Sequence, residues 1–180
     1  MKRGIAAIAL IALLTLTATA QQKPITVDDV MDIVGASNPE ISPDGSWIIY
    51  SRSELNWKDN KRQSSVWIIS TDGKEHFRLT SHESDSAFSW APDGKTIAYT
   101  HMTGDGISDI WLIDADGRNA RQLTDNPERE MDPTWSPDGR WIAFVRGSLG
   151  APKIMIIKAD GSQEYTLTRG AAREGHPSWS

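Results

Sequence analysis

A short turn motif recurs along this chain at a nearly constant interval. Asp-Gly pairs end three related strings, WIISTDG, WLIDADG and MIIKADG, and both intervals between them are 44 residues. The aspartates of these pairs are Asp72, Asp116 and Asp160. A second motif, Pro-Asp-Gly, repeats with spacings of 49 and 45 residues, and its prolines are Pro43, Pro92 and Pro137. Equivalent residues at a fixed spacing indicate that the chain repeats one structural unit.

Each unit has the pattern of four short strands. In the third copy, residues 133–136 (PTWS) and 140–144 (RWIAF) predict two strands, and the Ser-Pro-Asp-Gly sequence between them has the preferences of a type I turn. In the second copy, residues 109–113 (DIWLI) and 120–124 (ARQLT) predict the third and fourth strands. The longer first interval predicts extra residues in a surface loop at about 53–64.

A repeat of about 40 to 50 residues with four antiparallel strands is typical of a β-propeller blade. The sequence therefore predicts an all-β fold: an incomplete β-propeller of three four-stranded antiparallel blades, followed by the first strand of a fourth. The repeats span about residues 38–84, 85–129 and 130–173, and the next begins at 174–180. A β-sandwich or closed β-barrel is the alternative, but neither requires equal spacing of equivalent residues.

Propellers close with about four to eight blades. Three blades would leave two apolar sheet faces uncovered, so we expect the sequence to be part of a longer protein. Assembly of two copies into one closed ring is a less favoured alternative, because it demands a seamless junction.

Seven of the eight tryptophans recur at equivalent repeat positions. They are Trp47 and Trp141, Trp67 and Trp111, and Trp90, Trp135 and Trp179. This recurrence predicts that they pack between blades rather than form an aromatic platform for a ligand. Trp57 lies outside the pattern, in the charged first loop, and is therefore the aromatic residue that we predict to contact a partner.

The N-terminal residues predict a secretory signal peptide at 1–20. Lys2 and Arg3 precede an apolar run that is short for a membrane anchor, and an Ala-x-Ala site predicts cleavage between Ala20 and Gln21. Residues 21–37 follow as a separate segment, in which a capping box at Thr26 and an apolar stripe predict a short helix that ends near Gly35. We expect a periplasmic or secreted protein without a stable membrane anchor.

Composition excludes several classes of function. The chain has no cysteine and therefore no disulfide framework. Its formal net charge is −5 and becomes more negative when the signal is removed, so binding to nucleic acid is not expected. No nucleophile elbow, metalloprotease motif or P-loop is present, so we predict no catalytic, cofactor-binding or metal-binding residue.

The four histidines are expected in turns or loops, and their positions in the sequence do not have the spacing of metal ligands. An acidic cluster, Glu128, Glu130 and Asp132, is expected to be solvated.

The repeat pattern resembles that of known propeller families. The string WSPDGRWIAF at 135–144, together with DIWLIDADG at 109–117 and RQLT at 121–124, is similar to TolB-like repeats. It is equally similar to the N-terminal propeller of the prolyl oligopeptidase family of serine peptidases, of the dipeptidyl- and acylaminoacyl-peptidase types. The resemblance covers residues 38–180.

The resemblance implies two alternative functions. In the peptidases, a helical segment precedes the first blade, as predicted here, whereas a separate α/β domain precedes the propeller of TolB. The peptidase alternative implies a non-catalytic propeller that covers the active site of a downstream α/β-hydrolase domain and filters peptide substrates. The paired glutamates that bind the peptide amino terminus in some dipeptidyl-peptidases have no match here. The TolB alternative implies a module that binds periplasmic proteins, and a carbohydrate- or surface-associated propeller is a third possibility.

Overall fold

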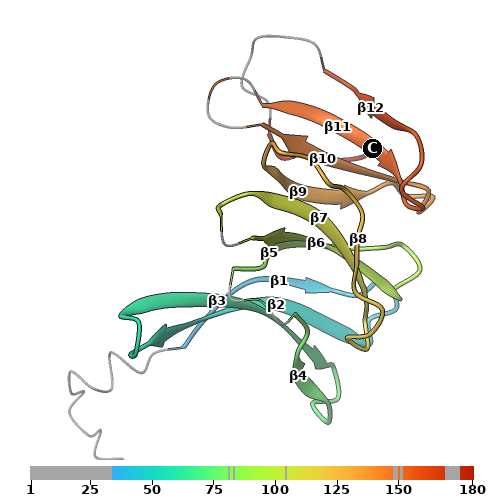
Figure 1. Cartoon of the computed structure of the whole chain (residues 1–180). Coiled ribbons are helices and arrows are strands. Elements are labelled where there is room, and N and C mark those ends of the chain that lie inside the picture. The colour runs from blue at the N-terminus through green and yellow to red at the C-terminus, as the bar shows by residue number, and fades with distance from the viewer. Residues whose placement is uncertain are drawn as a thin grey trace, which may run out of the picture.

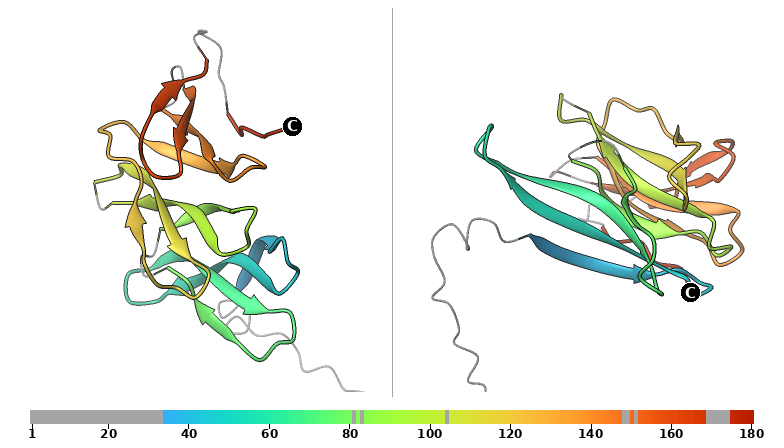
Figure 2. Two further views of the ribbon diagram at one scale, coloured as in Figure 1. Left: turned by 90° about the vertical axis from the view of Figure 1, so that its right-hand side faces the viewer. Right: turned by 90° about the horizontal axis from the view of Figure 1, so that it is seen from below.

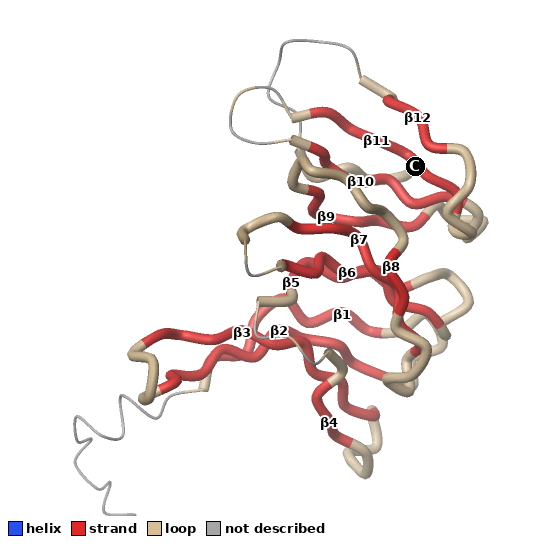
Figure 3. Tube along the Cα trace, in the orientation of Figure 1, coloured by secondary structure: helices blue, strands red, loops and turns tan. Residues whose placement is uncertain are grey.

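The computed structural model describes residues 34–80, 82, 84–103, 105–147, 150, 152–168 and 175–180. These residues form strands and loops but no helix (Figure 3), and consequently none that could span a membrane. The signal peptide, its cleavage site at Ala20 and Gln21, and most of the predicted helix lie outside the described residues. Gly35, which was predicted to end that helix, is the first residue of a strand.

Three separate sheets contain all the strands of the described residues. The first sheet consists of β1 (Gly35–Ile41), β2 (Trp47–Asn56), β3 (Lys61–Ser70) and β4 (His76–Arg78). The second consists of β5 (Ser86–Trp90), β6 (Thr96–Met102), β7 (Ser108–Asp114) and β8 (Arg121–Gln122). The third consists of β9 (Glu130–Trp135), β10 (Trp141–Arg146), β11 (Lys153–Lys158) and β12 (Glu164–Thr166). Neighbouring strands are antiparallel and follow chain order in every sheet, so the predicted four-stranded blades are confirmed.

The sheets stack face to face in chain order (Figures 1 and 2). Alternation along β6 explains the stacking, because successive residues of a strand point to opposite faces. Ile97 and Tyr99 belong to one apolar cluster with residues of the first sheet, whereas Ala98 belongs to a second cluster with residues of the third sheet. The middle blade is therefore covered on both faces, and each outer blade on one.

Four of the seven recurring tryptophans pack between the blades, as predicted, and these are Trp47, Trp90, Trp111 and Trp135; the other three belong to neither apolar cluster. Trp90, Tyr99 and Phe144 are 8%, 4% and 0% exposed. Trp67 is half-buried in β3 between two residues that face the second blade, Val66 and Ile68, so its ring points to the opposite, uncovered face of the first blade.

The Pro-Asp-Gly turns have the predicted geometry. In the third blade, the Gly139 N–H donates to the Ser136 carbonyl at 2.9 Å, and the Ser136 hydroxyl donates to Asp138 Oδ1 at 2.6 Å. Gly139 has a φ of +68°, which glycine adopts without a steric penalty. A Cβ at Gly139 would lie 3.7 Å from Pro92 Cδ, so successive turns also stack on one another.

A β-bulge recurs in the first strand of each blade, and the sequence pattern did not reveal it. Asn38, Ala87 and Asp132 occupy equivalent repeat positions and have φ values of +52°, +42° and +55°. The pairing register shifts at each of these places. The bulge interrupts the pairing and bends the first strand of each blade.

Residues 175–180 form no strand, although they were predicted to begin one. They nevertheless follow the repeat. His176 has the same positive φ as its equivalents, at +54°, and Trp179 Nε1 donates to the Thr134 carbonyl at 3.1 Å. This contact places the start of a fourth repeat beside the innermost strand of the third blade.

The extra residues of the first repeat do not form the predicted loop. They lengthen β2 and β3 into strands of 10 residues each, and only Trp57–Asn60 forms the turn. Paired β-strands satisfy backbone groups that an open loop would leave to water. The insertion is therefore a long hairpin that reaches beyond the loops of the other blades (Figure 1).

Replacement of Ala87 by Asn should stabilise the protein by about 0.5–1 kcal/mol, because Asn tolerates a positive φ better than Ala does. The first blade already has Asn38 at this position. Urea unfolding should show the gain, and the reciprocal Asn38→Ala variant should lose a similar amount. A loss of stability in Ala87→Asn would contradict the assigned backbone conformation.

The Asp44→Asn variant should show a weaker loss of stability in acid than the unmodified protein. Hydrogen bonds from Ser42 and Ser46 lower the pKa of Asp44 from 3.8 to about 2. The contribution of this carboxylate to the free energy of unfolding is therefore complete above about pH 4 and is lost as pH falls through about 2. Urea unfolding between pH 2 and 5 should give a flatter pH dependence for the variant. Identical curves would show that the turn hydrogen bonds are not formed.

Candidate functional site

The buried carboxylates of the described residues gather at one end of the three sheets. Asp85, Asp109 and Glu130 are 1%, 5% and 0% exposed, and each lies at or next to the first residue of a strand. We call this region the hairpin end and define it by residues 56–61, 84–86, 105–109 and 130. It contains the tips of hairpins β2–β3 and β6–β7, which lie at the left of Figure 1. The Pro-Asp-Gly and Asp-Gly turns occupy the opposite end.

An acid–base pair recurs at the hairpin end of two blades. Glu130, six residues before the Ser136 of its turn, lies opposite Arg146 in the β9–β10 register. Asp85 precedes its own turn by the same distance and binds His101, the repeat equivalent of Arg146. The equivalents in the first blade, Ala36 and Arg52, are also paired in register but have no carboxylate. The Arg52 guanidinium instead donates to Glu54 Oε2 at 3.0 Å and lies 4.5 Å from the Trp67 ring centroid.

The third blade contains the stronger version of this pair. The Arg146 Nε donates to Glu130 Oε1 at 2.6 Å, and its Nη1 and Nη2 donate to the two oxygens of Glu164 at 2.6 Å. Burial raises the pKa of Glu130, and a hydrogen bond from Thr124 and the charge of Arg146 only partly oppose it. Burial also acts to lower the pKa of Arg146, but its two carboxylate partners outweigh this effect and raise it. Glu130 is therefore a buried structural group and not the solvated residue predicted from the sequence.

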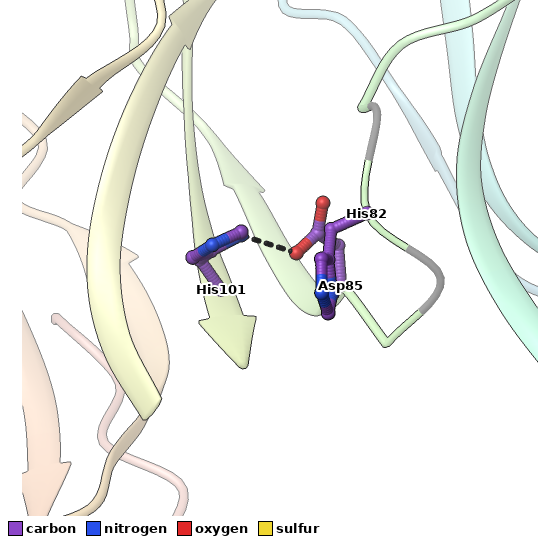
Figure 4. Close-up of side chains that lie close together, drawn as sticks. All are labelled: His82, Asp85 and His101. Atoms are coloured by element: carbon purple, nitrogen blue, oxygen red, sulfur yellow. Dashed lines mark hydrogen bonds and ion pairs between the residues drawn. The ribbon is translucent and has the colours of Figure 1, made fainter. Parts of the chain in front are cut away.

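The second blade has a histidine cluster in the same place. His82, from the connection between β4 and β5, lies close to Asp85 and to His101 in β6 (Figure 4). One possible ligand atom from each residue lies within 4.8 Å of the others. The His101 Nδ1 is 2.7 Å from Asp85 Oδ1, and the two imidazole centroids are 5.0 Å apart. The His82 Nδ1 is buried without a hydrogen-bond partner.

The structure corrects one sequence prediction about the histidines. His101 and His76 belong to strands β6 and β4, and not to turns or loops. The histidines also do not need sequence spacing to meet, because strand pairing brings Asp85 to His101 across 16 residues. Alignment of the repeats on Asp85 and Glu130 would have revealed that Asp85 and His101 lie together. Their equivalents in the third blade, Glu130 and Arg146, have opposite charges and are therefore expected to pair.

Trp57 is 56% exposed at the tip of the β2–β3 hairpin. The Asn56 side chain orders this turn: its Oδ1 accepts from the Lys58 N–H at 3.0 Å, and its Nδ2 donates to Asp59 Oδ2 at 2.9 Å. Its exposure agrees with the surface position predicted for it. A partner contact at Trp57 stays a prediction.

The outer face of the third blade carries an apolar depression of about 450 Å³. It is lined by Ala143, Ile154, Ile156, Leu167, Thr168, Gly175 and residues 177–179. Leu167 is 62% exposed there, whereas its repeat equivalents Leu79 and Leu123 are 4% and 9% exposed because the next blade covers them. This face has the shape and composition of a surface that receives another blade.

Residues 34–180 match the family model described as the TolB beta propeller domain. The chain belongs to this family. An uncharacterized peptidase, YuxL, of Bacillus subtilis is 35% identical over 130 residues, which are 72% of this chain and 20% of the peptidase. Dipeptidyl-peptidase 5 of Porphyromonas endodontalis is 27% identical over 71% of this chain and 18% of its own length.

A solved structure gives the same result. The putative TolB from Agrobacterium tumefaciens superposes with a TM-score of 0.66 at 29% identity, over 79% of this chain and 50% of that protein. The predicted resemblance to both peptidase and TolB propellers is confirmed. The chain spans about one fifth of the length of the two peptidases.

Replacement of Arg146 by Met should destabilise the protein by about 3 kcal/mol, because it leaves the buried Glu130 carboxylate without its cation. The double variant Glu130→Gln with Arg146→Met should recover most of this loss. Urea unfolding at pH 7.5 would measure the free energy of unfolding of the unmodified protein, the two single variants and the double variant. Additive effects of the two changes would contradict a coupled pair.

Proposed function

We propose that this chain is the non-catalytic propeller portion of a secreted or periplasmic serine peptidase, in which it covers the active site and filters peptide substrates. The observation that supports this most directly is the 35% identity to the peptidase YuxL. The match covers only 20% of the length of that peptidase. The rest of such a protein has room for a catalytic domain. Its partners would be a downstream α/β-hydrolase domain and peptide substrates, and no cofactor is required.

The proposal places the nucleophile and its base outside the described residues. Two histidine side chains in strands have hydrogen-bond partners, and these are Tyr50 for His76 and Asp85 for His101. Among the described residues, no serine hydroxyl binds a histidine ring as the nucleophile of a serine peptidase does.

A second candidate function is a TolB-like module that binds periplasmic proteins. The 29% identity and the TM-score of 0.66 to the putative TolB structure favour it. In this alternative, the exposed Trp57 on its long hairpin would be a natural contact residue, because exposed aromatic side chains often anchor protein interfaces.

The natural full-length protein, with its signal removed, should react with a fluorescent fluorophosphonate probe and hydrolyse peptidyl-nitroanilide substrates. Residues 21–180 should do neither, because the nucleophile is expected downstream. Replacement of the serine in a downstream G-x-S-x-G motif by alanine should abolish both signals. A full-length protein without such a motif and without labelling would eliminate the peptidase function and favour the TolB-like module. Turnover that copurifies with residues 21–180 would contradict the non-catalytic assignment.

A further inference from the structure

We infer that His82, Asp85 and His101 form a binding site for a divalent transition-metal ion, most suitably Zn²⁺. Two imidazoles and one carboxylate are a donor set that Zn²⁺ accepts, with water as a fourth ligand. Mg²⁺ and Ca²⁺ are poor matches, because they prefer sites made of oxygen ligands. The inference does not depend on whether the parent protein is a peptidase.

The distances suit a metal site that closes on binding. Zinc lies about 2.0–2.2 Å from nitrogen and oxygen ligands, so tetrahedral geometry places ligand atoms about 3.3 Å apart. The 2.7 Å contact between Asp85 and His101 must open slightly, and the widest separation within the cluster, at most 4.8 Å, must shorten by up to about 1.5 Å. His82 lies outside the strands, so its side chain would make the larger adjustment, whereas His101 is held in β6.

Burial gives a second, independent argument. Asp85 is 1% exposed, and a buried carboxylate is costly unless a cation compensates it. The equivalent carboxylate of the third blade, Glu130, has the permanently charged guanidinium of Arg146. Asp85 has an imidazole instead, and the His82 Nδ1 beside it is buried without a hydrogen-bond partner. A metal cation would satisfy the carboxylate and recruit the second imidazole.

Comparison of the two blades shows how the sequence changes the chemistry. Histidine replaces arginine at position 101, and His82 replaces Pro127, its equivalent three residues before the carboxylate. Arginine cannot ligate a metal because it stays protonated, whereas neutral imidazole is a common zinc ligand. The two differences together convert an ion pair into a ligand set.

The site would join two blades. His82 belongs to the connection that leaves the first blade, while His101 belongs to the second strand of the next. A bound ion would fasten this connection to β6 and stabilise the folded state, since any ligand that binds only the folded protein does so. The His101 side chain is 20% exposed, which leaves an entry path for the ion.

The test is titration of the natural full-length protein, prepared without a histidine tag and treated with a chelator that is then removed. Calorimetry with Zn²⁺ at pH 7.5 should show one saturable site, and Zn²⁺ should raise the unfolding temperature. Co²⁺ should give visible absorption bands of a four-coordinate complex. Mg²⁺ should neither bind at this site in calorimetry nor raise the unfolding temperature.

Three variants separate a metal site from a structural contact. His82→Ala should weaken Zn²⁺ binding at least tenfold without loss of the fold. His101→Arg should also abolish binding but keep the fold, because it restores the carboxylate–guanidinium pair of the third blade. The control variant is His176→Ala, which changes a histidine whose side chain is 92% exposed. It should bind Zn²⁺ as tightly as the unmodified protein. Absence of saturable Zn²⁺ binding, or binding that His82→Ala and His101→Arg leave unchanged, would overturn the proposal.

Discussion

The architecture depends on the burial of both faces of every sheet by its neighbours. Successive residues of each strand point in opposite directions, so a strand of consecutive apolar residues has apolar side chains on both sides of the blade. In the middle blade, Ile97 and Ala98 enter different apolar clusters, one with each neighbouring sheet. Stacked Pro-Asp-Gly turns add a second contact between successive blades. The two uncovered faces follow directly from the number of blades in this sequence.

The same constraint gives the blades their chemical differences. A buried polar position at the hairpin end must be compensated within the fold, and each blade uses a different solution. The third blade pairs Glu130 with Arg146, and the second pairs Asp85 with His101. The first has alanine in place of the carboxylate, and its Arg52 pairs with Glu54 and lies over Trp67. A repeat can therefore keep its backbone while one position acquires new chemistry.

The sequence predicted the features that repeat and missed those that depend on contacts between strands. The spacing of equivalent residues predicted the repeated blade, the apolar strings between turns predicted its strands, and the Ser-Pro-Asp-Gly residues predicted the turn type, because these features follow from local residue preferences and period. The positive φ at Ala87 was not predictable, since alanine has no preference for that conformation. Glu130 seemed solvated within an acidic string, but pairing of β9 with β10 buries it against Arg146. The histidine cluster required the same register information.

The most direct test of face-to-face stacking introduces single cysteines into these 180 residues, which contain none, and compares each variant with the same protein before the change. Leu167 is 62% exposed here, whereas its equivalent Leu79 is 4% exposed beneath the following blade. In the natural full-length protein, a Leu167→Cys variant should therefore react with a maleimide as slowly as Leu79→Cys, while Trp57→Cys should react rapidly. Rapid labelling at Leu167 would show that no blade covers this face and would contradict the propeller account.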